Sequence, residues 1–151
     1  MASSLSYLTG DLPPRAEGNT NYMVTWTLSN STNSVSQALV TASLPIYTDW
    51  VGFVAGTKEN ISYNKEKREI TWKIGSVPPG TGVDSNREVS FIVNFKPSIS
   101  QVGLSPLLIQ NISLSGTDSY SGAQVGSTMN NLYISSISGA SAGEGNGRVS
   151  N

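Results

Sequence analysis

The chain of 151 residues contains neither cysteine nor histidine. Without cysteine it can form no disulfide, offer no thiol nucleophile and build no thiolate metal site. Without histidine it lacks the side chain that most often serves as a general base near neutral pH and as a metal ligand. A serine nucleophile would have no histidine to take its proton, so we predict that the protein is not an enzyme.

Charge is also scarce, at 13% of residues against about 25% in ordinary globular domains. Nine basic and ten acidic residues give a net charge of −1, and no basic stripe exists to neutralise nucleic-acid phosphates or an anionic membrane surface. No apolar run approaches the roughly 18 residues of a membrane span, so we expect no membrane insertion. Ser, Thr, Asn and Gly supply the polarity instead, a composition common in secreted and envelope β-proteins.

The first residues, MASSLSYLTG, have neither the basic region nor the apolar run of a signal peptide. The chain is therefore expected to be either cytosolic or a mature or excised part of an exported protein. The composition favours the second reading, an extracellular or cell-envelope location.

Three segments alternate apolar and polar residues with a period of two, which is typical of half-buried strands. Asn21–Ser29 places Tyr22, Val24, Trp26 and Leu28 on one face; the segment from Arg68 places Ile70, Trp72 and Ile74 on one face; and Arg87–Lys96 places Val89, Phe91, Val93 and Phe95 on one face. Shorter or weaker strands are predicted at Leu5–Leu8, Val35–Leu44, Trp50–Ala55, Asn60–Tyr63, Leu107–Gly116, Tyr120–Val125 and Asn131–Ile134. In Leu107–Gly116 the better core candidates are Ile112 and Leu114.

Turn residues separate these strands, and no segment has a helical period. The sequence therefore predicts an all-β protein, an antiparallel Ig-like β-sandwich of about eight or nine strands. We expect a single domain at residues 1–137. From Ser138 to Asn151 the chain reads as a flexible Gly/Ser-rich tail or linker.

Several motifs follow one another in a set order: YMVTWTLSN, ALVTASLP, ISYNKEKREITWKIGSVPPGTG, VSFIVNF and QNISLSGTD. This series resembles the Ig-like repeat family of bacterial and archaeal surface proteins, a domain of the DUF-eleven type. The matching positions are Asn30, Leu44-Pro45, Trp72, Ile74-Gly75 and Gly80, and the resemblance spans Thr20 to Asp118. It implies an Ig-like sandwich in a secreted or surface protein, acting as a stalk, spacer or adhesive unit. Some relatives occur in filament-like assemblies, and the extra C-terminal strands depart from the simplest repeats.

Three aromatic residues are predicted to form the structural core: Trp26, Trp72 and Phe91. A buried tryptophan removes about 150–250 Å² from water. With no disulfide available, we expect Trp72 to pack against the opposite sheet near Trp26.

Two ligand sites can be read from the sequence, each with a simpler alternative. Tyr47 and Trp50 form a possible stacking platform for a sugar; alternatively Trp50 packs on the rim of the sandwich. The run Asp84–Glu88 places oxygen side chains at alternate positions, as calcium loops do, and Asp11, Asp49 and Asp118 join it only if the fold brings them there. The alternative is a polar loop entering a strand, and otherwise no cofactor is expected.

Two further chemistries have specific residue requirements: the isopeptide bond of some surface Ig-like domains, and glycoside hydrolysis. A Lys–Asn isopeptide bond needs a core-facing lysine, whereas Lys73 and Lys96 are predicted on outer faces, with Asn111 as the possible partner. A glycosidase needs two carboxylates across a cleft, and the ten acidic residues are scattered along the chain.

Three functional hypotheses result. The first is a non-enzymatic extracellular structural module, a stalk, spacer or adhesin domain whose partners are other surface domains. The second is a subunit of an extracellular filament, self-associating by edge-strand addition through Leu5–Leu8 and Asn131–Ile134. The third is a carbohydrate-binding module that binds glycans at Trp50.

Overall fold

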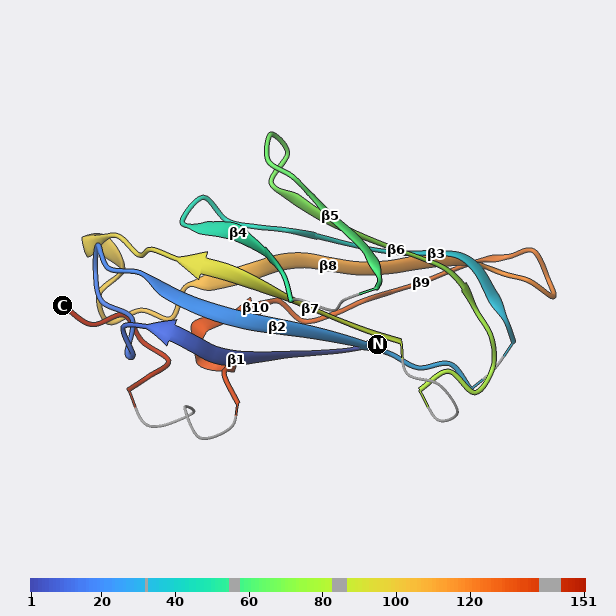
Figure 1. Cartoon of the computed structure of the whole chain (residues 1–151), viewed down its shortest axis with the longest axis horizontal. Helices are drawn as coiled ribbons and strands as arrows, with labels where there is room; N and C mark the ends of the chain where they lie inside the picture. The colour runs from blue at the N-terminus through green and yellow to red at the C-terminus, as the bar shows by residue number, and fades with distance from the viewer. Residues whose placement is uncertain (32, 55–57, 83–86, 139–144) are drawn as a thin grey trace.

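Ten β-strands and two short 3₁₀ turns, with no α-helix, form from the described residues of the computed structural model (Figure 1). The described residues are all except 32, 55–57, 83–86 and 139–144. The strands are β1 (Ala2–Gly10), β2 (Thr20–Leu28), β3 (Val35–Ser43), β4 (Thr48–Phe53), β5 (Asn60–Asn64), β6 (Glu69–Val77), β7 (Arg87–Phe95), β8 (Leu107–Asp118), β9 (Gln124–Thr128) and β10 (Leu132–Tyr133). The 3₁₀ turns are η1 (Ile99–Gln101) and η2 (Ile134–Ser136). No helix in this described part of the chain is long and apolar enough to cross a membrane.

The strands make two sheets that pack face to face, as the layers in Figure 1 show. One sheet has the order β1-β2-β7-β4; the other has the order β10-β8-β3-β6-β5, and β9 also pairs with β8. Every strand pair is antiparallel. The predicted antiparallel sandwich is confirmed.

The core lies between the sheets and follows the predicted alternation. Every second residue of β2 is buried from Thr20 to Leu28, and β7 buries its own alternate residues. Trp26 of one sheet stacks on Trp72 of the other with ring centroids 6.4 Å apart, and Phe91 meets Trp26 edge-on at 4.9 Å. All three rings are fully buried. At about 25 cal/mol per Å², each tryptophan contributes roughly 4–6 kcal/mol as an upper bound.

The long strand β8 changes phase in its middle, which the sequence did not predict. Asn111 has a positive φ of 57°, a left-handed conformation that asparagine tolerates better than most residues. Leu108 and Ile109 are both fully buried before it, and Ile112 is buried after it. The prediction of Ile112 is confirmed. Leu114 lies on the same face two residues later but is only half-buried, because it lines a pocket that is open to solvent.

The predicted strand Tyr120–Val125 is wrong in its first half. Asp118 Oδ1 accepts the backbone N–H groups of Tyr120 and Ser121 at 2.8 and 3.0 Å, and this side-chain bonding closes a tight turn. Tyr120 therefore stands at the hairpin tip, 89% exposed, and the strand begins only at Gln124.

The predicted flexible tail is also corrected where the structure describes it. The Ser138 N–H donates to Leu5 O at 2.9 Å, and the Ser150 N–H donates to Pro14 O at 2.7 Å. Val149 is 2% exposed and belongs to the core. The last residues are therefore packed on the sandwich. Val149 is buried there, and its backbone bonds to the segment that contains Val102. Residues 139–144 of the predicted tail lie outside the described residues.

Candidate functional site

The two rings of the predicted sugar platform turn toward the core. Trp50 on β4 stacks on Phe91 at 5.2 Å and on Tyr63 of β5 at 5.7 Å, with the latter rings only 8° from parallel. Tyr47 instead meets Phe95 edge-on at 5.7 Å. Trp50 thus joins the edge strands of the two sheets on one side of the sandwich. This geometry matches the alternative reading, packing on the rim.

The predicted calcium ligands are not brought together in the part of the chain that the structure describes. Asp49 Oδ1 lies 3.3 Å from Arg68 Nη2, whereas Asp118 closes the β8–β9 turn. The described residues contain no group of three or more acidic, His or Cys side chains able to hold a metal ion. Residues 84–86 of the predicted loop lie outside the described part, so the calcium prediction stays a prediction.

The condition for a Lys–Asn isopeptide bond is not met. All five lysines of the chain are exposed, Lys73 and Lys96 among them, and so is the possible partner Asn111. The outward placement predicted for Lys73 and Lys96 is therefore what the structure has.

Two short motifs familiar from serine enzymes occur in the chain but form no site in the described structure. Ser62 and Lys65 have Ser-x-x-Lys spacing, yet both are exposed at the β5–β6 hairpin, where nothing excludes water. The Gly-x-Ser-x-Gly sequence at residues 139–143 lies outside the described residues.

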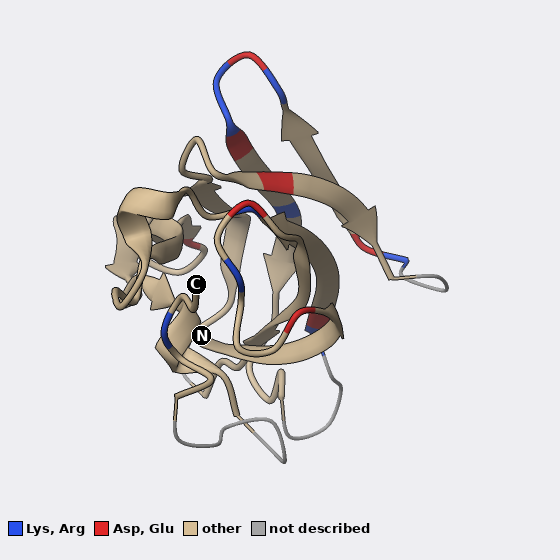
Figure 2. Cartoon of the chain, turned by 90° about the vertical axis from the view of Figure 1, so that its left-hand side faces the viewer, with Lys and Arg blue, Asp and Glu red and all other residues tan. Residues whose placement is uncertain are grey.

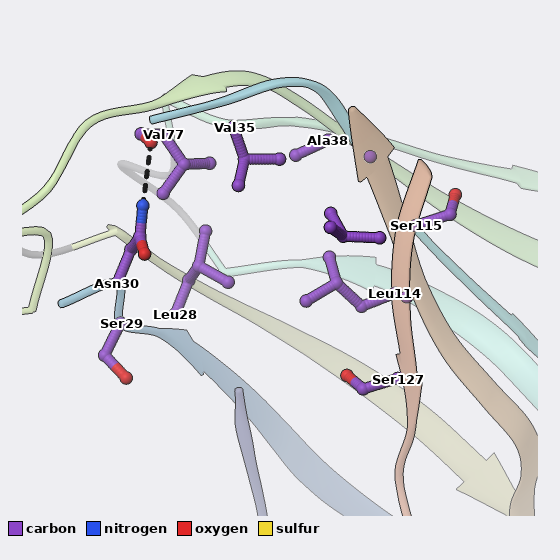
Figure 3. A pocket seen from close by; sticks show the side chains of 12 residues that line it. Leu28, Ser29, Asn30, Val35, Ala38, Val77, Leu114, Ser115 and Ser127 are labelled. Carbon is purple, nitrogen blue, oxygen red and sulfur yellow. Dashed lines mark hydrogen bonds between the residues drawn. The ribbon is translucent and has the colours of Figure 1, made fainter. Parts of the chain in front are cut away.

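A pocket of about 190 Å³ opens between the two sheets where β2 ends, beside β8 and β9 (Figure 3). Its lining residues are Leu28, Ser29, Asn30, Val35, Ala38, Val77, Leu114, Ser115, Gly116, Val125, Gly126 and Ser127. The Asn30 amide donates to Val77 O at 3.0 Å on its wall, and Figure 3 shows the apolar side chains of Leu28, Val35 and Leu114 lining it. None of the lining side chains titrates near neutral pH, so the pocket offers apolar contact and no acid–base chemistry.

A shallower hollow of about 380 Å³ lies near η1. It is lined by Glu17, Ile46, Tyr47, Lys96, Pro97, Ser98, Ser100 and Gln101. Burial raises the pKa of the Tyr47 hydroxyl on its wall. Ile46 and Ile99 beside it are 83% and 70% exposed. Of the predicted sugar platform, Tyr47 therefore borders this hollow and Trp50 does not.

The two ends of the described chain are fixed at opposite ends of β1. Ala2 pairs with Thr27 at the end of β2. Beyond the other end of β1, Ser150 forms a parallel bridge with Arg15, and Val149 forms one with Val102. The nine residues of β1 alone span about 27 Å, at about 3.4 Å for each step, so the two points lie far apart. The positions marked N and C in Figure 1 show this separation along the long axis. The sequence did not predict this anchorage, because Val149 is the one apolar side chain in residues 145–151.

Comparison with known proteins identifies the fold. No protein-family model and no curated protein matches the sequence. Among solved structures, domains D2 and D3 of the major pilin SpaD from Corynebacterium diphtheriae match 87% of this chain and 51% of theirs, with 9% identity and a TM-score of 0.51. The RrgA Jo.In complex matches 85% of this chain and 76% of its own, with 8% identity and a TM-score of 0.52. BcpA, the major pilin subunit of Bacillus cereus, matches 87% of this chain at 12% identity with a TM-score of 0.50.

The chain spans between 34% and 51% of the length of the major pilin chains it matches. At these identities the likeness concerns the backbone arrangement alone. The described chain therefore has the Ig-like β-sandwich fold found in domains of major pilins.

Proposed function

We propose that the protein is a non-enzymatic structural module of an extracellular or cell-surface protein, a stalk, spacer or adhesin domain. The observation that carries this proposal is the anchorage of the two ends at opposite ends of β1. The Ser150 N–H donates to Pro14 O, and the Ala16 N–H donates to Ser150 O at 2.9 Å. The likeness to pilin domains and the weakly charged, Ser- and Thr-rich surface support the same role.

The anchorage determines how the domain would carry a pulling force. A force between the two ends runs along β1, parallel to the strand axis and perpendicular to the β1–β2 hydrogen bonds. These bonds are then loaded together in shear and must break together. A force applied at a hairpin tip such as Glu66 would instead load the edge strand β5, which in the described structure is held to β6 alone by a shorter ladder of five pairs. The sandwich is therefore expected to resist end-to-end tension best, which is what a spacer requires.

Single-molecule force spectroscopy tests this proposal. The absence of cysteine allows a handle at one introduced cysteine, either at the C-terminal end or at Glu66→Cys, with the other handle kept at the N-terminal end. We expect a single high-force event in the end-to-end geometry and a lower-force event from the hairpin tip. A hairpin geometry that is as strong as the end-to-end one would remove the mechanical basis of the proposal.

The second candidate is a subunit of an extracellular filament, supported by the likeness to major pilin subunits. Of the two edge segments predicted for assembly, Leu5 already accepts the Ser138 N–H, and β10 consists of two residues paired with β8. A filament would therefore need another edge. Electron microscopy over a concentration series separates the candidates, because rods or fibres favour the subunit and their absence favours the spacer.

A carbohydrate-binding role has less support, because the rings of Tyr47 and Trp50 pack on core residues. Glycan titration monitored by tryptophan fluorescence would test it, with Trp50→Ala as the variant.

A further inference from the structure

β9 is an exposed edge strand that, among the described residues, pairs with β8 alone. All five of its residues are exposed, and it pairs with β8 in a regular register from Ser113–Thr128 to Thr117–Gln124. Beyond the two ends of this ladder, the Asp118 N–H donates to Ala123 O and the Met129 N–H donates to Ile112 O.

These two bonds fix the direction of every backbone group in β9. Antiparallel ladders alternate hydrogen-bonded and non-hydrogen-bonded pairs. Val125 and Ser127 therefore direct their N–H and C=O groups toward β8. The N–H and C=O groups of Gln124, Gly126 and Thr128 point away from β8, toward the open side.

The other long edges of the two sheets are protected in ways known from natural β-proteins. β1 has an irregular register between Tyr7 and Thr9, and Ser138 covers it at Leu5. β4 has an irregular register between Trp50 and Gly52. β5 is flanked by charged residues: Lys58, Glu59, Lys65, Glu66 and Lys67. Figure 2 shows both signs of charge on the hairpin that follows β5. β9 has a regular register, no proline and no charged residue.

The surroundings of β9 are also uncharged and partly apolar. From Pro97 to Gly143 the chain carries a single charged residue, Asp118. Val125 is 39% exposed, and with Ser127 it shares the face of Leu114 on the wall of the apolar pocket. A partner strand on this edge must therefore be uncharged and extended. β9 itself has these properties.

We propose that two copies of the chain associate through β9, pairing antiparallel about a two-fold axis at Gly126. In this register Gln124 pairs with Thr128 of the second copy, and Gly126 pairs with Gly126 of the second copy. Each of the three pairs exchanges two hydrogen bonds, so the outward groups of Gln124, Gly126 and Thr128 are satisfied on both sides. Val125 then lies opposite Ser127 of the second copy, which covers the exposed valine beside the pocket.

The contact is isologous, so it closes on itself and makes a dimer rather than a fibre. It neither requires nor excludes the spacer role, since β9 lies away from the β1 anchorage. Five-residue edges give a weak contact, which becomes effective where many copies are held at high local concentration.

A matched pair of charge variants tests the register. Gln124→Lys with Thr128→Lys places like charges opposite each other twice across the interface; Gln124→Glu with Thr128→Lys places opposite charges there. The net charges are −1 + 2 = +1 and −1 − 1 + 1 = −1, so overall repulsion is the same. By sedimentation equilibrium we expect the like-charged variant to dimerise about tenfold more weakly than the wild type, and the oppositely charged variant at least as tightly. A monomeric wild type over the whole concentration series, or an equal change in both variants, would overturn the proposal.

Disulfide trapping gives a second readout in a chain without cysteine. Cβ atoms of directly opposed residues lie about 4.5–5.5 Å apart, against about 7–8 Å for diagonal neighbours, and disulfides need the shorter spacing. A mixture of Val125→Cys and Ser127→Cys chains should therefore form a crosslinked dimer faster than either variant alone. Equal crosslinking of the mixture and of each single variant would exclude this register.

Discussion

Arg87 Nη2 lies 2.8 Å from Glu59 Oε1, and this ion pair ties the start of β7 in one sheet to the start of β5 in the other. The same carboxylate oxygen accepts the indole N–H of Trp72 at 3.1 Å. Arg87 Nη2 also donates to Ile74 O at 3.0 Å. The two charged side chains are 25% and 20% exposed. A mostly buried carboxylate thus holds a core tryptophan and an arginine of the facing sheet together.

Replacing Glu59 with alanine should destabilise the domain by about 2–3 kcal/mol, because the Trp72 N–H and the Arg87 guanidinium lose their shared acceptor. Glu59→Gln keeps a carbonyl oxygen for Trp72 and should cost less. Chemical denaturation measures both. Glu66→Ala, at an exposed position of the β5–β6 hairpin, should stay within about 0.5 kcal/mol of the wild type. Equal effects of Glu59→Ala and Glu66→Ala would show that the tie contributes nothing.

The two stacked tryptophans should respond differently to the same substitution. Trp72 donates to Glu59, whereas the Trp26 Nε1 atom is buried with no hydrogen-bond partner among the described residues. Trp→Phe leaves a similar cavity at either position, but only Trp72→Phe also removes a hydrogen bond. We expect Trp72→Phe to cost about 1 kcal/mol more than Trp26→Phe. Thermal or denaturant unfolding decides this, and a larger loss at Trp26 would contradict it.

Tyr22→Phe should be neutral or stabilising at pH 7, because the buried Tyr22 hydroxyl has no partner in the described structure. Burial, with a smaller effect of Tyr7, raises the pKa of Tyr22 well above its usual range. The unfolded chain therefore releases this proton first, from about pH 10. Above that pH it binds fewer protons than the folded chain, so stability falls as the pH rises.

The measurement is the free energy of unfolding at pH 7 and at about pH 10.5. The loss between these values should be smaller in Tyr22→Phe than in the wild type. Tyr120→Phe, at the exposed hairpin tip, is the control and should behave as the wild type does. An alkaline loss that is unchanged in Tyr22→Phe would assign it to other groups.

The sandwich could be predicted because β2 and β7 alternate between buried and partly exposed residues, and β6 does the same from Ile70 to Ile74. Hydrophobic burial on one face of a strand leaves this period in the sequence directly. β8 could not be phased in the same way, because the backbone at Asn111 inverts the alternation without changing the composition. An asparagine there is a weak signal, since most asparagines have negative φ.

The candidate sites depended on contacts between segments far apart in the chain, which periodicity does not encode. The ring partner of Trp50 is Tyr63 on the facing sheet, so a residue that looked available for a sugar is engaged in packing. Leu5 likewise belongs to a segment predicted as an open edge, whereas in the structure its carbonyl accepts the Ser138 N–H. Conversely, the outward groups of β9 could be recognised only once its register with β8 was known.

The Asp118 turn gives the hairpin beside β9 a dependence on acid pH. Hydrogen bonds from the backbone N–H groups of Ser121 and Tyr120, and one from the Asn33 amide, lower the pKa of the Asp118 carboxyl. Because the folded pKa lies below the unfolded one, the stabilisation is present above about pH 4. It is lost as the pH falls through the folded pKa.

In an NMR titration, the amide resonances of Tyr120 and Ser121 should therefore shift together as Asp118 takes up its proton. Asp118→Asn keeps an oxygen acceptor that does not titrate, so its turn should persist and these resonances should stay constant at low pH. Asp118→Ala removes the acceptor and should lose the turn at every pH, with faster hydrogen exchange at Ser121. If the Asp118→Asn resonances titrated as the wild type's do, another carboxyl group would have to control the turn. The pairing of β9 would then have no acid-sensitive element at Asp118.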